Sequence, residues 1–287
     1  MTTRLLTVRS ADGAAHERFH MFVPLTFRTV DFRRWESRGG WNEDYTAYLL
    51  EDEGEIVASV GVTRMRLVLN GAAQEGWQLG AVATHPERRG RGYSRVLLDA
   101  VLDGLGAAPV LLFANERVLD FYPRLGFRAV AQQRFVADVA LQPAIAQARR
   151  CDVADDDARA ELAALCAEAI VNDAAFGARD YYSTLLWHLT YRAIDAYWLD
   201  DGNAVAAVER DGDTLVLHDL IARRPFDLAA ALPALIDAPA ARIEFGFRPQ
   251  RWWPTASEAG EYDGSPLFVR NLPTLDTSLR FPDLAQT

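Results

Sequence analysis

The feature that most constrains this chain is a strand-like run that leads into a basic, glycine-bearing loop and then into a helix. Leu79–Val82 is apolar and strand-like, residues 84–92 form the loop, and Val96–Leu105 carries apolar side chains at helical spacing. Such a turn directs several backbone N–H groups and the positive end of a helix at one point. The sequence therefore predicts a diphosphate-binding site in the first half of the chain.

The loop contains the residue types that a phosphate site needs. Gly90 and Gly92 permit a close approach of the backbone to a ligand, and Arg88, Arg89 and Arg91 add positive charge. Other common phosphate loops do not fit. The dinucleotide fingerprint lacks its third glycine here, and a P-loop needs a lysine, which the chain does not contain.

Two motifs in the first half resemble those of the GNAT superfamily of N-acyltransferases. Residues 89–94, Arg-Gly-Arg-Gly-Tyr-Ser, resemble the pyrophosphate motif R/Q-x-x-G-x-G/A, with a serine at the last position. Downstream, residues 112–116 and 121–127, Leu-Phe-Ala-Asn-Glu and Phe-Tyr-Pro-Arg-Leu-Gly-Phe, resemble the next block of the family, a strand followed by an aromatic helix end. The resemblance implies an enzyme that transfers an acetyl group from acetyl-CoA to an amine by direct attack in a ternary complex.

The resemblance also implies a role for individual residues. The backbone of three residues would pair with the pantetheine arm like an added strand: Val82, Ala83 and Thr84. Six further residues would hold the diphosphate through their amides: Arg89, Gly90, Arg91, Gly92, Tyr93 and Ser94. Asn115 would contact the pantetheine arm, and Tyr122 would protonate the departing thiolate. As an alternative, Tyr122 is a packing aromatic.

The general base and the acceptor pocket are not specified by a motif. Glu75, His85, a water molecule and the terminal carboxylate of Thr287 are the alternatives for the base, the last of them by resemblance to acetyltransferases of the enhanced-intracellular-survival type. Four aromatic residues could line an acceptor pocket or pack in the core: Trp35, Trp41, Tyr45 and Trp77.

The order of elements predicts a mixed α/β (α+β) chain with two domains in tandem. Residues 1–142 would form the catalytic GNAT domain and residues 150–287 a second, degenerate GNAT-like domain, each a mostly antiparallel twisted sheet flanked by helices. This layout resembles the first two domains of the enhanced-intracellular-survival group, without its third domain. In the second half, Ala222–Asp227 stands where a pyrophosphate loop would be, but it has no glycine and Pro225 lacks an amide donor. We therefore expect CoA to bind only in the first half.

Several boundaries follow from local signals. We expect a helix over Gly13–Val23 that stops at Pro24, and a hairpin turn at Asn70-Gly71. Phe127–Val139 reads as closing strand material, and Asp227–Ile236 reads as a helix.

A competing motif lies in the first predicted helix. His16-Glu17-Arg18-Phe19-His20 satisfies H-E-x-x-H, the zinc-peptidase pattern, and Glu43 could supply a third ligand. The metzincin extension fails, because Val23 and Thr26 replace its glycine and third histidine. Zinc hydrolysis is therefore a lesser alternative and we expect no metal. A non-catalytic acyl-CoA-binding regulatory module is the main alternative to the enzyme.

The composition of the chain argues against several classes of partner and chemistry. The net charge of −10 argues against a nucleic-acid partner and mildly favours a cationic acceptor, so we expect a small-molecule amine. Without lysine there is no Schiff-base chemistry. The apolar runs are too short to span a membrane and the first residues do not resemble an export signal, so we expect a cytoplasmic protein. The oligomeric state stays open, a homo-oligomer included.

Overall fold

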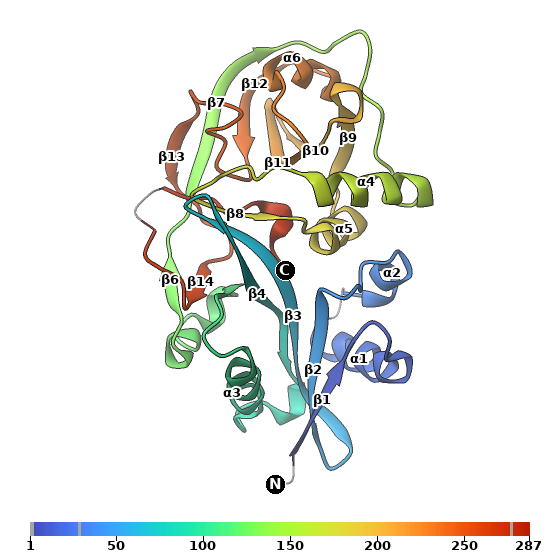
Figure 1. The fold of residues 1–287 in the computed structure, drawn as a ribbon, viewed down its shortest axis with the longest axis vertical. Helices are drawn as coiled ribbons and strands as arrows, with labels where there is room; N and C mark the ends of the chain where they lie inside the picture. Colours follow the sequence, from blue (N-terminus) through green and yellow to red (C-terminus); the bar gives the residue numbers. More distant parts are fainter. Residues whose placement is uncertain (1–2, 28–29, 276–277) are drawn as a thin grey trace.

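Two β-sheets, each flanked by helices, form the two lobes of the molecule (Figure 1). The structure is a computed structural model that describes residues 3–27, 30–275 and 278–287. Most neighbouring strands in both sheets are antiparallel, and each sheet contains one parallel pair. The predicted mixed α/β class is therefore confirmed. None of the described helices is long and apolar enough to cross a membrane.

The larger sheet forms the lower lobe in Figure 1. Its strands, in spatial order, are β1 (Thr3–Val8), β2 (Tyr45–Asp52), β3 (Glu55–Leu69), β4 (Ala72–Thr84), β5 (Val110–Phe113), β14 (Leu267–Arg270) and β6 (Arg128–Val130), with β8 (Phe176–Arg179) paired to β3. The β3–β4 turn is the predicted one at Asn70-Gly71, and both residues have positive φ, as a tight hairpin turn requires.

The smaller sheet repeats the arrangement of the larger one. Its strands, in spatial order, are β13 (Ser257–Glu261), β7 (Gln133–Leu141), β12 (Ala240–Phe245), β11 (Thr214–Ala222), β10 (Ala204–Asp211) and β9 (Asp195–Leu199). In both sheets an antiparallel hairpin, β3–β4 or β10–β11, is followed by a parallel pair, β4–β5 or β11–β12. This repeat agrees with the tandem layout that the element order predicts.

The larger sheet takes two strands, β8 and β14, from the second half of the chain, and the smaller sheet takes one, β7, from the first half, so the sheets do not separate at the predicted boundary between residues 142 and 150. β14, from the second half of the chain, pairs with β5, whereas β7, from the first half, pairs with β12. The strand material expected over Phe127–Val139 is present as β6 and β7, but the two strands belong to different sheets and only β6 closes the larger one. The chain passes between them at buried Gln132, whose side chain accepts a hydrogen bond from the amide of Phe281 and whose carbonyl accepts one from that of Tyr262.

Helices cover both faces of the larger sheet. α1 (Gly13–Thr26) and α2 (Phe32–Ser37) lie on one face, and α3 (Tyr93–Leu105) lies on the other (Figure 1). The remaining α-helices are α4 (Asp156–Glu168), α5 (Tyr182–Tyr191) and α6 (Leu228–Ala231). The short 3₁₀ turns are η1 (Pro86–Arg88), η2 (Glu116–Val118), η3 (Tyr122–Leu125), η4 (Asp200–Gly202), η5 (Leu232–Leu235) and η6 (Asp283–Ala285).

Two predicted helix boundaries are wrong. α1 does not stop at Pro24 but continues to Thr26, since a proline near the last turn removes only one amide donor. The helix expected over Asp227–Ile236 is only the four-residue α6 followed by η5, because Pro233 interrupts the α-helical hydrogen bonding and sits at the start of the 3₁₀ turn.

One hydrophobic core extends from the first lobe into the second and contains the C-terminal segment. Trp35 on α2 donates a hydrogen bond of 2.9 Å from its indole nitrogen to the carbonyl of Ser183, in the first turn of α5. Phe281, Leu284 and Ala285 are fully buried in the same core. The C-terminus consequently lies between the lobes beside β3 and β4 (Figure 1). This packing brings both halves of the chain to one site.

Candidate active site

The predicted phosphate loop is open. Gly90 and Gly92 both have positive φ, and a Cβ atom at either position would meet nothing within 4 Å. Gly92 is the N-cap of α3 and offers no side-chain cap to the amides of the first helical turn. These amides have no partner within the helix, so they are available to an anion.

The arginines of the loop differ in their partners. Arg88 is held by Glu55 at 3.0 Å. Arg89 and Arg91 are exposed and take part in no ion pair among the residues that the structure describes. Positive charge without a protein partner beside open helix amides fits a diphosphate group.

Two side chains fix the loop to the rest of the lobe. The hydroxyl groups of Thr84, at the end of β4, and Ser94, in the first turn of α3, are hydrogen-bonded to each other. A glycine or alanine, which the family motif has at position 94, could not form this hydrogen bond to Thr84. The buried Tyr93 donates a hydrogen bond of 2.5 Å to Asp52 at the β2–β3 turn, so only its backbone remains for a ligand.

The central strands separate next to the loop. β4 and β5 pair in parallel from Trp77↔Val110 to Leu79↔Leu112 and then diverge, and the amide of Ala114 bonds instead to the carbonyl of Pro266, on the far side of β5. At the same level β4 bulges at Ala81, which has a φ of +47°. The stretch from Gly80 to Thr84 therefore has no strand partner on its β5 side within the described pairing, which is the opening that an extended ligand arm could fill.

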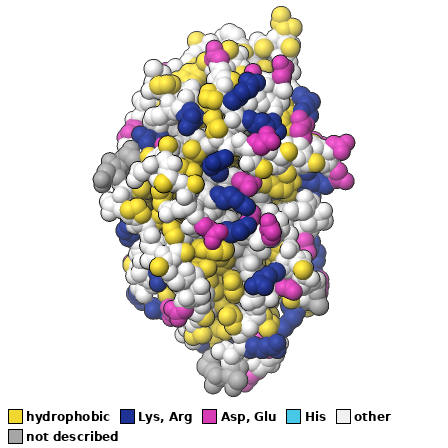
Figure 2. Space-filling view, viewed as in Figure 1, with side chains coloured by type: hydrophobic (Ala, Val, Ile, Leu, Met, Phe, Trp, Pro, Cys, Tyr) yellow, Lys and Arg dark blue, Asp and Glu magenta, His cyan; other side chains and the backbone are white. Residues whose placement is uncertain are grey.

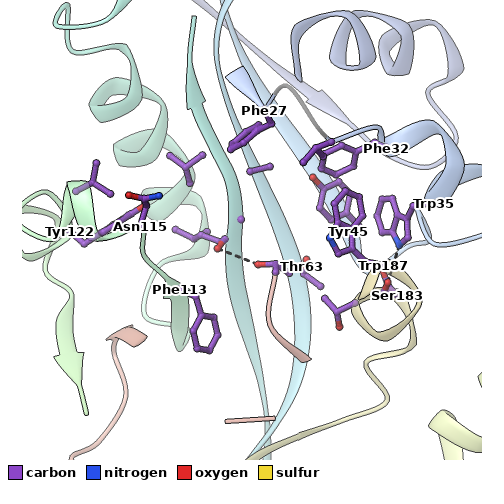
Figure 3. A pocket seen from close by; sticks show the side chains of 18 residues that line it. Phe27, Phe32, Trp35, Tyr45, Thr63, Phe113, Asn115, Tyr122, Ser183 and Trp187 are labelled. Atoms are coloured by element: carbon purple, nitrogen blue, oxygen red, sulfur yellow. Dashed lines mark hydrogen bonds between the residues drawn. The ribbon is translucent and has the colours of Figure 1, made fainter. Parts of the chain in front are cut away.

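A cavity of about 390 Å³ lies at this opening. Its walls come from both halves of the chain: Phe27, Val30, Phe32, Trp35, Tyr45, Thr63, Leu79, Gly80, Ala81, Val82, Phe113, Asn115, Val118, Tyr122, Ser183, Thr184, Trp187 and Thr287. Aromatic side chains gather at one end, and Asn115 and Tyr122 lie at the other, across β4 (Figure 3). Figure 2 shows hydrophobic side chains gathered over the lower half of the molecule in the same view as Figure 1.

The structure brings Asn115 and Tyr122 together on the cavity wall. Asn115 accepts a hydrogen bond from the amide of Arg117 at its side-chain oxygen, which leaves its side-chain nitrogen for another partner. Tyr122 is buried and stands at the first position of η3. Burial raises the pKa of Tyr122, so the phenol keeps its proton at neutral pH and can donate it.

Thr287 reaches the cavity because Gln78 binds the end of the chain. The buried Gln78 side chain donates a hydrogen bond to the carbonyl of Ala285 and accepts one from the amide of Thr287, each of 2.8 Å. The side chain of Thr287 lies directly over Gly80, where an added Cβ would stand 2.6 Å from the Thr287 hydroxyl oxygen. His188 on α5 adds a hydrogen bond of 2.8 Å to the carbonyl of Gln286.

Only some of the other residues predicted for the site line the cavity. Trp35 and Tyr45 line the cavity, whereas Trp41 is buried against His16 and Trp77 lies outside the cavity lining. Glu75 on β4 is exposed and lies beside Arg64 on β3. His85 caps η1, where its ring accepts a hydrogen bond from the amide of Glu87. Neither of these two candidate bases lines the cavity.

The cavity wall from α5 was missing from the prediction. Ser183, Thr184 and Trp187 belong to the second half of the chain, and their contact with α2 depends on tertiary packing alone. No local motif in the sequence marks the face of α5 as part of a site.

The H-E-x-x-H residues form a separate cluster on α1. His16 and His20 both contact Glu36 on α2, not Glu43, whose side chain is exposed. Glu17, the base of the peptidase pattern, points to the surface and pairs with Arg33 at 2.9 Å. The glutamate that the pattern requires as base is therefore turned away from the histidines, which disfavours peptide hydrolysis.

The equivalent loop of the second half is closed by its own hydrogen bonds. The amides of Arg223 and Arg224 bond to the backbone and side-chain oxygens of Asn203. Asp227 caps α6 with its carboxylate, which places negative charge where an anion would have to bind. This geometry supports the expectation that the second half binds no CoA.

Comparison with known proteins agrees with the fold. Residues 7–130 match the family described as acetyltransferase (GNAT) domain. No curated protein matches the chain significantly.

Solved structures resemble the whole chain at low sequence identity. A probable N-acyltransferase from Enterococcus faecalis shares 14% identity with a TM-score of 0.59, over 94% of this chain and 73% of that one. Eis1 from Mycobacterium abscessus shares 17% with a TM-score of 0.58, over 94% and 73%. A GCN5-related N-acetyltransferase from Kribbella flavida shares 15% with a TM-score of 0.58, over 93% and 70%. The family match thus assigns residues 7–130 to the acetyltransferase (GNAT) domain family, and the fold of the whole chain resembles that of these longer proteins.

Proposed function

We propose that the chain transfers an acetyl group from acetyl-CoA to a primary amine of a small molecule, by direct attack in a ternary complex. The observation that carries the proposal is the cavity at the split between β4 and β5. It brings the free strand edge, Asn115, Tyr122 and Thr287 to one place, next to the open loop at 89–94. A strand edge, an anion site and an acid are the parts that acyl transfer from a CoA thioester needs.

The chain's own groups fit acetyl-CoA along the split. The amides of Arg89, Gly90, Arg91, Gly92, Tyr93 and Ser94 would bind the diphosphate, with Arg89 and Arg91 supplying charge. The backbone of Val82, Ala83 and Thr84 would bind the pantetheine arm as an added strand. The side-chain nitrogen of Asn115 would donate to the same arm. When bound, the cosubstrate supplies the activated acetyl group.

Tyr122 would donate its proton to the departing thiolate. Its raised pKa keeps the phenol protonated, and its place on the cavity wall next to Asn115 puts it at the pantetheine end of the site. A CoA thiol has a pKa of about 8.5, so the acid assists departure and does not have to overcome a very poor leaving group.

In a chain that ends at Thr287, the terminal carboxylate would accept the proton of the attacking amine. An amine arrives as an ammonium ion and must lose a proton before it can attack. Gln78 and His188 hold the backbone of residues 285–287 against β4, so the carboxylate has a fixed place at the cavity. Glu75 and His85 lie outside the cavity lining, which favours Thr287 over them.

The aromatic end of the cavity would bind the acceptor. Phe27, Phe32, Trp35, Tyr45 and Trp187 form it. Aromatic faces attract cations, and each such contact contributes about 0.5–2 kcal/mol. This wall, together with the negative net charge, supports a cationic amine as substrate.

Release of free CoA thiol from acetyl-CoA in the presence of an amine panel tests the proposal. We expect acetyl-CoA to raise the melting temperature of the wild-type protein and at least one amine to release thiol. Tyr122→Phe should lower kcat by about a hundredfold while the thermal shift by acetyl-CoA remains.

Different outcomes separate the alternatives. A thermal shift without thiol release across the panel supports a non-catalytic acyl-CoA-binding module. The absence of a thermal shift at millimolar acetyl-CoA would contradict both the acetyltransferase and the acyl-CoA-binding module.

A further inference from the structure

The α1–α2 contact contains a cluster of two histidines and one glutamate outside the cavity. His16 and His20 stand one helical turn apart on the same face of α1, and Glu36 reaches them from α2. The nitrogen and oxygen atoms that each residue offers lie within 4.8 Å of one another. Both imidazoles are about 95% buried, whereas the side chain of Glu36 keeps an exposed fraction of 31%.

His16 faces two acceptors at once. Its Nδ1 lies 2.5 Å from Oε1 of Glu36, and its Nε2 lies 2.7 Å from the carbonyl oxygen of Arg9. A neutral imidazole has only one N–H, so one of the two contacts lacks a proton unless the ring is charged. A metal cation resolves the conflict, because Nε2–H then donates to Arg9 while Nδ1 and the carboxylate both bind the cation. A carbonyl that accepts from the second ring nitrogen is the usual support of a metal-binding histidine.

Glu36 has the charge that a metal ligand needs. Its two carboxylate oxygens face one histidine each, Oε1 toward Nδ1 of His16 and Oε2 toward Nε2 of His20. The cluster thus offers two imidazoles and one carboxylate, a donor set that suits zinc and other divalent transition metals.

We propose that His16, His20 and Glu36 form a binding site for a divalent transition-metal cation, zinc in the first instance, that ties α1 to α2. The ligand atoms need about 3.3 Å between neighbours around a zinc ion with bonds of about 2 Å, a small adjustment from the present spacing. This inference replaces the sequence-based expectation of no metal. It does not extend to hydrolysis, because the Glu17 carboxylate is turned away to Arg33.

The site lies behind the aromatic wall of the cavity. Trp41 stacks on the ring of His16 with centroids 4.1 Å apart and also contacts Trp35, which lines the cavity. Phe27 follows α1 directly, and Phe32 begins α2. A cation that joins α1 to α2 would therefore fix the position of the aromatic side chains that line the acceptor end of the cavity.

Metal binding to the full chain tests the proposal without reference to activity. The purified protein is stripped with a chelator, dialysed and titrated with Zn²⁺ in competition with a chromophoric chelator. We expect one Zn²⁺ per chain for the wild type and for the control Glu17→Gln, which alters an exposed carboxylate on the same helix. Glu36→Gln should bind at least tenfold more weakly, because it keeps the shape of the side chain but loses the anionic ligand.

A second measurement keeps the test decisive if Glu36→Gln does not fold, as judged by circular dichroism. The stripped wild type is titrated with Co²⁺, and intense visible absorption bands of four- or five-coordinate Co²⁺ are expected, which Zn²⁺ then displaces. Equal Zn²⁺ affinity of wild type and Glu36→Gln, an equal loss in Glu17→Gln, or only the weak spectrum of hydrated Co²⁺ would overturn the proposal. None of these results depends on whether the chain transfers acetyl groups.

Discussion

The side-chain oxygen of Gln78 accepts a hydrogen bond of 2.8 Å from the backbone amide of Thr287, across 209 residues of sequence. The nitrogen of the same side chain donates to the carbonyl of Ala285. A fully buried side chain in the middle of β4 thus fixes the terminal segment at the cavity. These two hydrogen bonds join residues 285–287 to a strand about 200 positions away in the sequence.

Replacing Gln78 by leucine should lower kcat without changing the KM for acetyl-CoA. The variant leaves the Thr287 amide and the Ala285 carbonyl without their partner, which should cost about 1–3 kcal/mol of unfolding free energy and misplace the terminal group. A misplaced catalytic group costs about a hundredfold in rate. Steady-state kinetics and chemical denaturation measure the two effects. Gln74→Leu on the same strand, outside the cavity, is the control and should keep the wild-type kcat. An unchanged kcat in Gln78→Leu would show that the position of Thr287 does not matter for catalysis.

Replacing Gly80 by alanine should displace Thr287. The new methyl group would stand 2.6 Å from the Thr287 hydroxyl, closer than carbon and oxygen atoms can approach. We expect a fall in kcat of about tenfold or more. The matched control is Gly104→Ala on α3, where a Cβ meets nothing within 4 Å and should stabilise the helix by about 0.5–1 kcal/mol. If both variants retain full activity, Thr287 plays no part in turnover.

Replacing Arg89 and Arg91 together by alanine should raise the KM for acetyl-CoA by about tenfold and leave kcat at saturation unchanged. Neither arginine forms an ion pair within residues 3–27, 30–275 and 278–287, and each would contribute charge-assisted hydrogen bonds to the diphosphate. Arg88→Ala is the control and should change the KM less, because the Arg88 side chain is already paired with Glu55. An equal rise in KM for Arg88→Ala would show that only the overall charge of the loop matters, and the effect should then disappear at high salt.

His188 should make stability depend on pH in the acidic range. Burial lowers the pKa of His188 from its ordinary 6.5 to about 4. The unfolded chain takes up a proton as pH falls below 6.5 while the folded chain does not, so stability is lost between pH 6.5 and 4, by about 3 kcal/mol in total. Urea denaturation of wild type and His188→Gln at a series of pH values measures this contribution. The variant should lose less stability than the wild type over that window, and parallel pH profiles would contradict the assignment.

Local chemistry explains what the sequence could predict. The strand, loop and helix from Leu79 to Leu105 appear as expected, because glycine conformation and helical periodicity act over a few residues. The structure also places Tyr122 and Asn115 on one wall and the loop residues beside the strand end, as the motifs imply. Their roles toward acetyl-CoA stay predictions.

Long-range packing explains what the sequence could not predict. Trp187 lines the cavity only because α5 packs against the first lobe, which no local pattern signals. Thr287 is a candidate for the site by resemblance alone, since no local pattern brings the terminal segment to β4. Glu36 joins His16 and His20 from a separate helix, and no spacing in the sequence distinguishes it from Glu43 as a third ligand. The strand boundary at Gln132 depends on contacts with residues about 150 positions away.

The exchange of β7 and β14 has a consequence for how the molecule is made. The larger sheet lacks the strand between β5 and β6 until residues 267–270 have left the ribosome, and the smaller sheet incorporates a strand synthesised well before its neighbours. The larger sheet therefore cannot be completed during synthesis of the first half, and β5 carries an unpaired strand edge until β14 has been synthesised.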